Sequence, residues 1–529
     1  RILGPMLRSG ELPTFRRLID EGAWGSFLTY GQASSPMVWT SMATGKRVRD
    51  HGINDFVTKS DAGYGVAPMK SYDRHARAIW NILGDFGFRV GVIDWLITYP
   101  PEEVNGYIVS RLHLDEPNRT YPPALNGDVE AIRAEVTDYG DADRTKNFGQ
   151  IDHVFETAEL LLDREPLDFL ALFEGVSDWV EHRYWKYYEP DRFAPELWSY
   201  SPGEVREFGS IIPETYAHLD RRLGELMQRL DDDALLLVVS DHGQKAVPGR
   251  QVWLRVDRLL EALGYAELEG EGEEAVVVHA GSRAYAATET PWAPLIGVNV
   301  NVRGREPEGI VDPADAEAVA RELEAALRAV RFEDGTPLFG AIGAPGEAAA
   351  GSVAGQSDIV ITHSRFTRSD RYSQETILVG ERRYRLDDFM EADVKISGGH
   401  DHQGVIFVHG RCVRPGPIGQ LTVTTPLQEV LWHVTDKIDA VDPWLPVLGR
   451  LGIIERGTTL DVTPTVLYAL GLPVADDMAG KPLASRIRTG QEPTTIASYE
   501  TDAGGNLRAV DVESDEDMMK RLKALGYIN

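Results

Sequence analysis

Cysteine is almost absent from this sequence of 529 residues, since Cys412 is the only one. A single cysteine cannot form an intrachain disulfide, and it cannot supply the several thiolates of a structural zinc site. Any transition metal in this protein must therefore be held by histidine and carboxylate side chains.

Positive charge is also scarce, because 54 Lys and Arg residues stand against 83 Asp and Glu residues and leave a net charge of -29. Binding along a nucleic-acid backbone depends on clustered Lys and Arg, so this composition argues against nucleic-acid scaffolding. A small phosphorylated substrate stays compatible with it, since a bound metal ion can reverse the charge of a local site.

Long apolar runs are missing as well. No stretch approaches the roughly 18–20 residues of a membrane span, so we predict no such span and favour a cytoplasmic location. The chain starts at Arg1 without a methionine or a signal-like segment, which is typical of a fragment and leaves room for a removed leader. The sequence does not set the oligomeric state.

The composition that is present, 43% hydrophobic and 26% charged, is typical of a globular protein. Short apolar runs at 166–178 and 232–243 alternate with amphipathic segments such as "PETYAHLDRRLGELMQRL". Runs that are apolar on both faces predict an α/β fold with a mostly parallel sheet and helices on both sides. Nearer the amino end, one helix is expected to end near Gly22. The segment 75–96 reads as a helix, a glycine turn and a buried strand.

The length predicts more than one domain, since single cores stop growing at about 250–300 residues. From residue 245 the pattern changes to strand-like runs with turns and the helix-like "DPADAEAVARELEAALRAV", and it changes back near 390. We therefore predict four parts: the first part of an α/β core, an α+β insertion or cap, the second part of the core, and an acidic tail with a short helix. Their ranges are 1–244, 245–390, 391–490 and 491–529.

Acidic and imidazole side chains follow two of the apolar runs. In "VVSDHGQ", Asp241 and His242 come directly after a strand, a pairing that suits a divalent metal; a helix cap and a loop hydrogen bond are the alternative. In "GVSDWVEH", Asp178 and His182 stand four residues apart, so a helix beginning there puts both on one face. The alternative is again a cap with a half-buried histidine.

A third cluster is "SGGHDHQG", in which glycines let the backbone approach a ligand closely. His400 and His402 alternate and share a face in extended backbone, but a single metal ion would more naturally use one of them. His51 lies in a turn, and the remaining histidines lack acidic or glycine-rich company, so we expect these to be structural or solvated.

"SSPMVWTSMATG" places Ser34 and Ser35 before Pro36 at a predicted helix start. A hydroxyl is a poor nucleophile unless a base or metal activates it. A helix amino terminus would help to hold an anion. From this stretch alone an N-cap role is favoured.

Together, a hydroxyl before "PMVWTSMATG" and "HGI", then "SDxxxH", "SDHG", "GxHxxxG" and "DVTPTVLYALGLP" resemble the type I phosphodiesterase and nucleotide pyrophosphatase branch of the alkaline phosphatase superfamily. The resemblance covers nearly the whole chain. It implies an alkaline-phosphatase-like sheet sandwiched by helices, and a metal-dependent phosphodiesterase that acts on a small-molecule phosphate ester.

The resemblance also implies a two-metal site and a serine nucleophile that becomes phosphorylated. The nucleophile lies nine residues before the threonine of the Thr-Gly pair, which is Ser35. His400 is preferred to His402 because it has the family's spacing to Gly404. Zinc is the favoured metal and manganese the alternative. The implied ligands of one metal are Asp178, His182 and His400, and those of the other are Asp241, His242 and Ser35.

Two departures from the family pattern stand out. The family's first metal ligand, an aspartate after the first strand, is expected upstream of Arg1 and is absent from this sequence, as is that central strand. The position of an asparagine that steadies a phosphoryl oxygen in nucleotide pyrophosphatases is occupied by Phe56, which weighs against a nucleotide substrate.

Several rivals stay open. A sulfatase needs an arginine where Val38 stands, and a phosphomonoesterase or mutase shares the metal core. A non-catalytic phosphatase-like binding protein is a rival of another class. Lys46, Arg47 and Arg49 lie beyond the Thr-Gly turn and are expected to face solvent, so we favour diesters over monoesters.

Overall fold

The structure is a computed structural model. The residues it describes are 2–29, 34–60, 63–111, 119–137, 143–194, 198–249, 251–270, 275–287, 295–344, 357–363, 375–393, 396–418, 457–500 and Met519. The predicted tail helix at the carboxyl end lies outside these residues.

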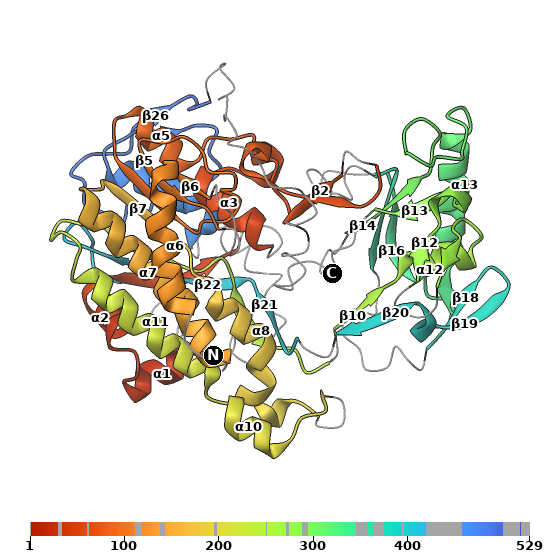
Figure 1. Cartoon of the computed structure of the whole chain (residues 1–529), viewed down its shortest axis with the longest axis horizontal. Helices are drawn as coiled ribbons and strands as arrows, with labels where there is room; N and C mark the ends of the chain where they lie inside the picture. Colours follow the sequence, from red (N-terminus) through yellow and green to blue (C-terminus); the bar gives the residue numbers. More distant parts are fainter. Residues whose placement is uncertain are drawn as a thin grey trace, which may run out of the picture.

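Two lobes make up the described chain (Figure 1). The larger, which we call the core lobe, comprises the described residues up to 249 and from 396 to 500. Its central strands form two half-sheets, with the orders β6-β5-β4-β7 and β23-β1-β22-β8, and β24 also pairs with β1. Their bounds are β1 (Ala23–Leu28), β4 (Val90–Ile93), β5 (Gly106–Val109), β6 (Thr120–Tyr121), β7 (Phe169–Leu172), β8 (Leu236–Val239), β22 (Gln403–His409), β23 (Gly416–Ile418) and β24 (Gly457–Thr458).

Helices cover both faces of the first half-sheet. Alternate residues of β4 point to opposite sides, as the two-residue period of a strand requires. Val90 and Val92 pack in the cluster with α3, α5 and α16, while Ile93 packs in the cluster with α2, α7, α8 and α11. The core-lobe helices are α1 (Leu3–Ser9), α2 (Pro13–Glu21), α3 (Ser35–Thr44), α4 (Val48–His51), α5 (Ile79–Asp85), α6 (Asn126–Thr137), α7 (Asp143–Arg164), α8 (Val176–Tyr188), α10 (Pro202–Phe208), α11 (Ile211–Met227) and α16 (Val462–Ala469).

The local predictions for the amino-terminal part are confirmed. α2 ends at Glu21, and the backbone N–H of Gly22 donates to Leu18 at its end. In the second segment, α5 is followed by Gly87, whose φ is +85, and then by the fully buried strand β4. The positive φ explains why a glycine stands in that turn.

Strand directions in the core lobe are mixed. β4 runs parallel to β5 and β7, and β1 runs parallel to β23 and β24. β22 runs antiparallel to both of its neighbours, β1 and β8. An apolar run has the same composition in either direction, so the sequence pattern does not show this reversal.

The smaller lobe, which we call the cap lobe, comprises the described residues from 251 to 393 and has its own apolar cluster, from Leu254 to Met390. It is connected to the core lobe through the antiparallel pair β10 and β20. Its elements are β10 (Gln251–Leu254), β11 (Leu268–Glu269), β12 (Val276–Val277), β13 (Ala284–Ala286), β14 (Leu295–Val300), β15 (Arg331–Phe332), β16 (Phe339–Gly343), β17 (Ile359–His363), β18 (Thr376–Val379), β19 (Arg382–Arg385), β20 (Met390–Asp393), α12 (Val256–Ala262) and α13 (Ala316–Ala329).

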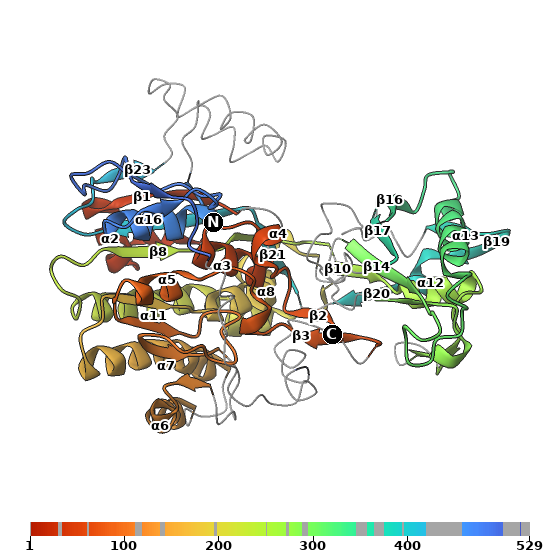
Figure 2. The same cartoon turned by 90° about the horizontal axis from the view of Figure 1, so that it is seen from above.

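A hairpin of the core lobe, β2 (Val57–Lys59) and β3 (Val66–Pro68), reaches toward the cap lobe (Figure 2). The Tyr64 hydroxyl at its tip donates to Asn301 Oδ1 at 2.6 Å, and the Tyr64 ring stacks on His279 with centroids 3.5 Å apart. This contact ties the two lobes together at a point away from the chain crossings.

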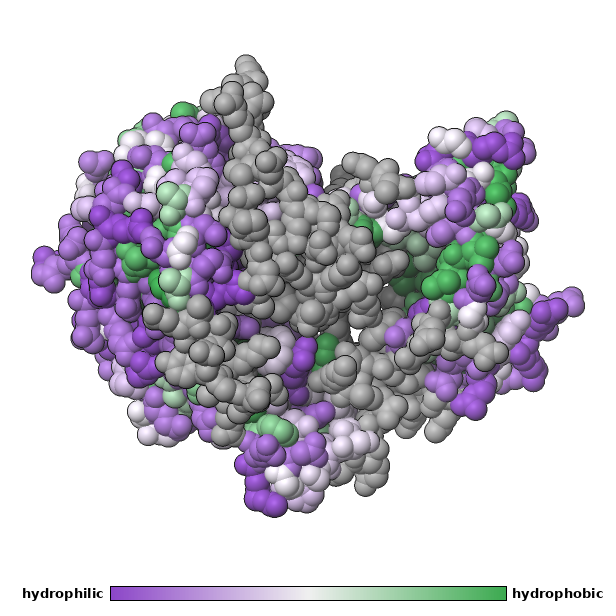
Figure 3. Space-filling view, in the orientation of Figure 1, coloured by the Kyte–Doolittle hydropathy of each residue, from purple (hydrophilic) through white to green (hydrophobic). Residues whose placement is uncertain are grey.

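The visible surface of both lobes is mostly hydrophilic (Figure 3), in keeping with the charged composition. Among the helices of the described residues, none combines the length and apolarity that crossing a bilayer requires.

Lys46 departs from the prediction that it faces solvent. Its ammonium group is buried and lies 2.8 Å from Asp477 and 2.8 Å from Glu500. Burial would lower the pKa of Lys46, but the two carboxylates raise it above its usual value. Arg49 is exposed as expected. Lys46 therefore fixes the carboxyl end of α3 to the region after α16, away from the start of α3.

His51 is buried beside Ser41 of α3, and its hydrogen bonds fix its tautomer. Its Nδ1 accepts from the Ile53 backbone N–H at 3.1 Å, so Nε2 carries the proton and faces the Ser41 hydroxyl at 3.0 Å. Burial, with Arg74 and His75 nearby, lowers the pKa of His51 to about 3. A proton can be added only by breaking the bond from Ile53.

This histidine should make stability depend on pH. In the unfolded chain His51 binds a proton below about pH 6.5, whereas in the folded chain it does so only near pH 3. The contribution of His51 to the free energy of unfolding is therefore fully present above pH 6.5 and is lost as the pH falls below that value. The loss should reach about 2–3 kcal/mol by pH 4.5, at about 1.4 kcal/mol per unit. Urea unfolding midpoints from pH 7.5 to 4.5 would measure it. His51→Gln should flatten this part of the profile, and parallel profiles for the two proteins would contradict the prediction.

Candidate active site

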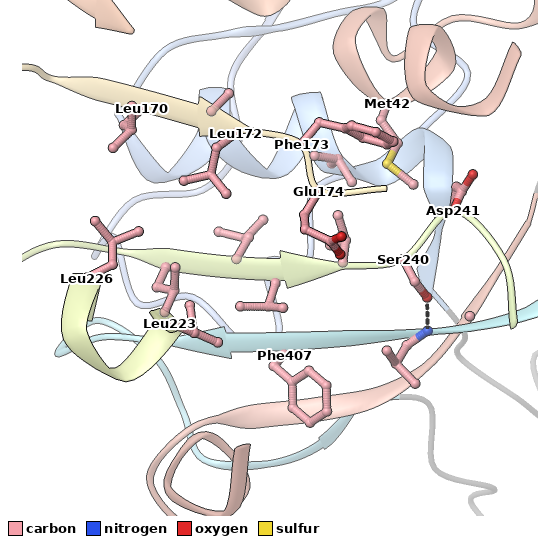
Figure 4. A pocket seen from close by; sticks show the side chains of 18 of the residues that line it. Met42, Leu170, Leu172, Phe173, Glu174, Leu223, Leu226, Ser240, Asp241 and Phe407 are labelled. Carbon is pink, nitrogen blue, oxygen red and sulfur yellow. Dashed lines mark hydrogen bonds between the residues drawn. The ribbon is translucent and has the colours of Figure 1, made fainter. Parts of the chain in front are cut away.

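The candidate site lies where β7 and β8 end, beside the amino end of α3. Asp241 follows β8, and Glu174 follows β7 and points toward β8 (Figure 4). The structure brings together all six side chains that the sequence singled out as nucleophile or metal ligands: Ser35, Asp178, His182, Asp241, His242 and His400.

Ser35 is the first residue of α3, and its hydroxyl donates to Asp241 Oδ2 at 2.7 Å. Ser34 occupies the N-cap position, but its side chain makes no capping hydrogen bond. The capping role that this stretch alone favours is therefore wrong for both serine side chains. Ser35 departs from the prediction because of a tertiary contact: its hydroxyl donates to Asp241, which comes from a distant segment of the chain.

Asp178, His182 and His400 offer ligand atoms that all lie within 4.8 Å of one another. α8 begins at Val176, so Asp178 and His182 are one turn apart, with 3.3 Å between His182 Nε2 and Asp178 Oδ1. His400 Nε2 lies 3.7 Å from the same carboxylate oxygen and 2.9 Å from His182 Nε2.

His242 lies between Asp241 and the cluster of Asp178, His182 and His400. Its Nε2 is 3.4 Å from Asp241 Oδ2 and 3.8 Å from Asp178 Oδ1, and its ring stacks on that of His400 with centroids 3.6 Å apart. This Nε2 atom is buried and has no hydrogen-bond partner. An orphaned buried nitrogen between two carboxylates fits a position facing a cation.

His182 and His242, which both lie near Asp178 Oδ1, share a further feature of metal ligands. His182 Nδ1 lies 2.8 Å from the Gly398 carbonyl and His242 Nδ1 lies 3.1 Å from the Gly243 carbonyl. A proton on Nδ1 leaves the Nε2 lone pair free to face a metal, and such backbone contacts orient ligating imidazoles. The donor set therefore fits a divalent transition metal such as zinc.

Glycines allow the backbone to come this close. β9 (Gly243–Ala246) pairs with β21 (Gly398–Asp401), which puts His400 opposite Gln244. A side chain at Gly398 would meet the Glu181 carbonyl, since a Cβ there lies 2.3 Å from that oxygen. A Cβ at Gly404 would lie 2.6 Å from Ser240 Oγ.

The carboxylate and the imidazoles of the cluster shift one another's pKa values. Burial alone would raise the pKa of Asp178, but His182 and its other histidine neighbours lower it well below the usual range. Burial lowers the pKa of His400 to about 4, and His242 adds to this effect. An ionised Asp178 beside a neutral His400 is the state that a cation requires.

Three supporting residues were missed by sequence reasoning. Gln244 donates from Nε2 to Asp178 Oδ1 at 2.9 Å. Glu174 accepts from Ser177 N at 3.1 Å and so caps α8. Glu181 accepts from the Tyr216 hydroxyl at 2.6 Å, and burial raises its pKa to about 8. The sequence did hold a signal for Gln244 in "DHGQ", because this residue follows His242 by two positions. It lies on β9, opposite His400 of β21.

His402 is exposed and lies outside the cluster, in contrast to half-buried His400. Asn105 precedes β5, which runs parallel to β4 and β7, so it lies at the amino end of these strands, whereas the site lies at their carboxyl end. Its side chain donates to the Phe88 carbonyl at 2.9 Å. Val38 is fully buried in the core. The position that would hold a sulfatase arginine is thus a core position.

Comparison with models of protein families identifies one family. The model of the family described as "Type I phosphodiesterase / nucleotide pyrophosphatase" matches residues 3–384. A search of curated proteins found no matching relative.

Among solved structures, the chain is similar to phosphonoacetate hydrolase from Sinorhizobium meliloti 1021 in complex with phosphonoformate. The identity is 16% and the TM-score 0.43, with 77% of this chain and 86% of that chain covered. It is also similar to human ectonucleotide pyrophosphatase/phosphodiesterase 5, at 12% identity and a TM-score of 0.44, with 89% of this chain and 92% of that chain covered.

Proposed function

Since this chain belongs to the type I phosphodiesterase/nucleotide pyrophosphatase family and is a phosphoric ester hydrolase, we propose that it is a metal-dependent phosphodiesterase with Ser35 as its nucleophile. The observation that carries this proposal is the hydrogen bond of 2.7 Å from Ser35 Oγ to Asp241 Oδ2 at the start of α3. It places a hydroxyl beside the Asp and His cluster.

The ligands in this proposal fall into two groups, and the rings of His242 and His400, one from each group, stack on each other. Asp178, His182 and His400 hold one divalent metal, and Asp241 and His242 hold the second together with Ser35. Metals bound there supply Lewis-acid stabilisation of charge on phosphoryl oxygens and lower the pKa of the serine hydroxyl and of water. Zinc is the metal that this donor set favours.

The residues of the chain carry the remaining roles. Asp241 Oδ2 accepts the hydrogen bond of the Ser35 hydroxyl and so holds that hydroxyl beside the cluster. Attack by Ser35 Oγ forms a bond to phosphorus and breaks the bond to the leaving alcohol. Water then cleaves the phosphoserine, which restores Ser35 and releases a phosphomonoester. The amino end of α3 favours the negative charge of the phosphoryl group.

A preference for diesters over monoesters should follow from the charges around Ser35. In the described chain the closest basic residue along α3, Lys46, is paired with Asp477 and Glu500 at the far end of that helix. A monoester brings one more negative charge and gains more from basic side chains near the nucleophile. We expect kcat/KM on an aryl phosphodiester to exceed that on the matching monoester by about tenfold or more, equal to about 1.4 kcal/mol of transition-state binding.

The measurement compares both substrates, and an aryl sulfate, with zinc or manganese present. Ser35→Ala serves as the control, because activity that survives it comes from a contaminant. A preference for the monoester or the sulfate ester would contradict the assignment.

A further inference from the structure

Gln244 lies in the site but has no role in the proposed mechanism. It stands on β9 opposite His400 of β21, and its Nε2 donates to Asp178 Oδ1 at 2.9 Å. The histidine neighbours of Asp178 keep its pKa well below the usual range, so this carboxylate is ionised and only accepts hydrogen bonds. The contact therefore identifies the nitrogen end of the Gln244 amide, and Oε1 is its other end.

The Gln244 carbonyl oxygen is buried, and within the described part of the chain it has no hydrogen-bond partner. Buried acceptors in folded proteins are almost always paired, either with protein groups or with water. Oε1 and Nε2 are bonded to the same carbon, so Oε1 lies close to Asp178 and to the cluster that this residue forms with His182 and His400. Oε1 therefore offers a place for a hydrogen-bond donor at the edge of that cluster.

The proposed reaction brings water to this side of phosphorus. Ser35 donates to Asp241 Oδ2, and His242 Nε2 lies 3.4 Å from that oxygen and 3.8 Å from Asp178 Oδ1. In an in-line displacement the leaving alcohol departs on the side of phosphorus away from Ser35, which is the side of Asp178. Water that cleaves the phosphoserine approaches along the same line and so arrives beside Gln244.

A carbonyl oxygen at this place acts differently in the two steps. In the first step the leaving oxygen gains negative charge, and an acceptor beside it gives no stabilisation. In the second step the attacking water carries protons, and an acceptor can align the water oxygen with phosphorus. A glutamine has this function in GTPases, where it orients the attacking water.

We propose that Gln244 orients the water that cleaves the phosphoserine, accepting a hydrogen bond from it at Oε1 while Nε2 stays on Asp178. This inference rests on the proposed function. The water oxygen forms a bond to phosphorus, and the bond from phosphorus to Ser35 Oγ breaks. The water loses one proton and the Ser35 oxygen regains one, while Gln244 accepts a hydrogen bond and no proton.

The test separates the two steps with Gln244→Met, which removes the amide at nearly constant volume. The whole chain is mixed with methyl para-nitrophenyl phosphate, with zinc in excess so that loss of the contact to Asp178 does not limit metal occupancy. Nitrophenol release measures the first step, and mass spectrometry of acid-quenched samples measures the phosphorylated Ser35. Decay of the phosphoserine should slow by about 10–100-fold, the effect of one hydrogen bond to a reacting group, while the nitrophenol burst rate should stay within about threefold.

Lys245→Met is the matched control, because Lys245 is the next residue of β9 and its side chain lies on the other face of that strand. It should leave both rates unchanged. Gln244→Asn keeps an amide that is one methylene shorter, and it should act in the same direction as Gln244→Met.

The two steps also distinguish this inference from its alternatives. If Gln244 only holds Asp178, its loss slows both steps equally, and that result would overturn the proposal. Phosphoserine that decays at the wild-type rate in both Gln244 variants would refute this inference alone. No phosphoserine in any of the proteins would refute the proposed function, and this inference with it.

Discussion

Replacing Ser35 with alanine should reduce kcat for phosphodiester hydrolysis by about 10⁴-fold or more, as loss of a nucleophile does in other enzymes. In the proposed mechanism, the hydroxyl that donates to Asp241 Oδ2 is the group that attacks phosphorus. Alanine is a good helix former and α3 keeps its Pro36 start, so the fold should survive. Steady-state kinetics with circular dichroism and metal analysis would measure all three properties.

Ser34→Ala is the matched control, because Ser34 is the neighbouring hydroxyl and makes no capping bond. It should retain activity within a few-fold. Substrate trapping followed by peptide mass spectrometry should find phosphate on Ser35. Phosphate on Ser34, or full activity in Ser35→Ala, would refute the assignment.

Alanine at His400 should lower metal content and activity together, with metal affinity falling by at least about 100-fold. Substitutions that only touch a ligand already cost about 10–100-fold, and His400 offers a ligand atom within 4.8 Å of those of Asp178 and His182. Metal analysis after dialysis against a weak chelator would measure the loss.

His402→Ala tests whether position or mere proximity matters, since His402 lies two residues away and is exposed. It should keep its metal and most of its activity. Equal losses in the two variants, or a larger loss at His402, would show that the cluster does not bind metal as proposed.

Much of what positions the site could be predicted from local pattern. An apolar run followed by Asp and His places Asp241 at a strand end, and the spacing of Asp178 and His182 needs only a helix that starts there. Both features depend on neighbouring residues, which the sequence displays directly.

Contacts between distant segments could not be predicted in this way. The contact of Ser35 with Asp241 depends on where α3 begins relative to the end of β8. Gln244 reaches Asp178 from β9, which pairs with β21. Lys46 is buried because two carboxylates about 430 and 450 positions away neutralise it, at Asp477 and Glu500. No local pattern distinguishes such a lysine from an exposed one.

The pairing of β10 with β20 has a consequence for how this protein evolves. Gln251 lies opposite Asp393 and Leu254 opposite Met390, so the cap lobe leaves and rejoins the core lobe at neighbouring points. Among the described residues, its main apolar cluster shares no residue with the main clusters of the core lobe, and a small further cluster joins Val57 of the core lobe to Ala287 of the cap lobe. We infer that the cap lobe is a cassette that recombination can exchange, since its two ends lie side by side. All six side chains of the proposed site lie in the core lobe, so such an exchange would leave them in place.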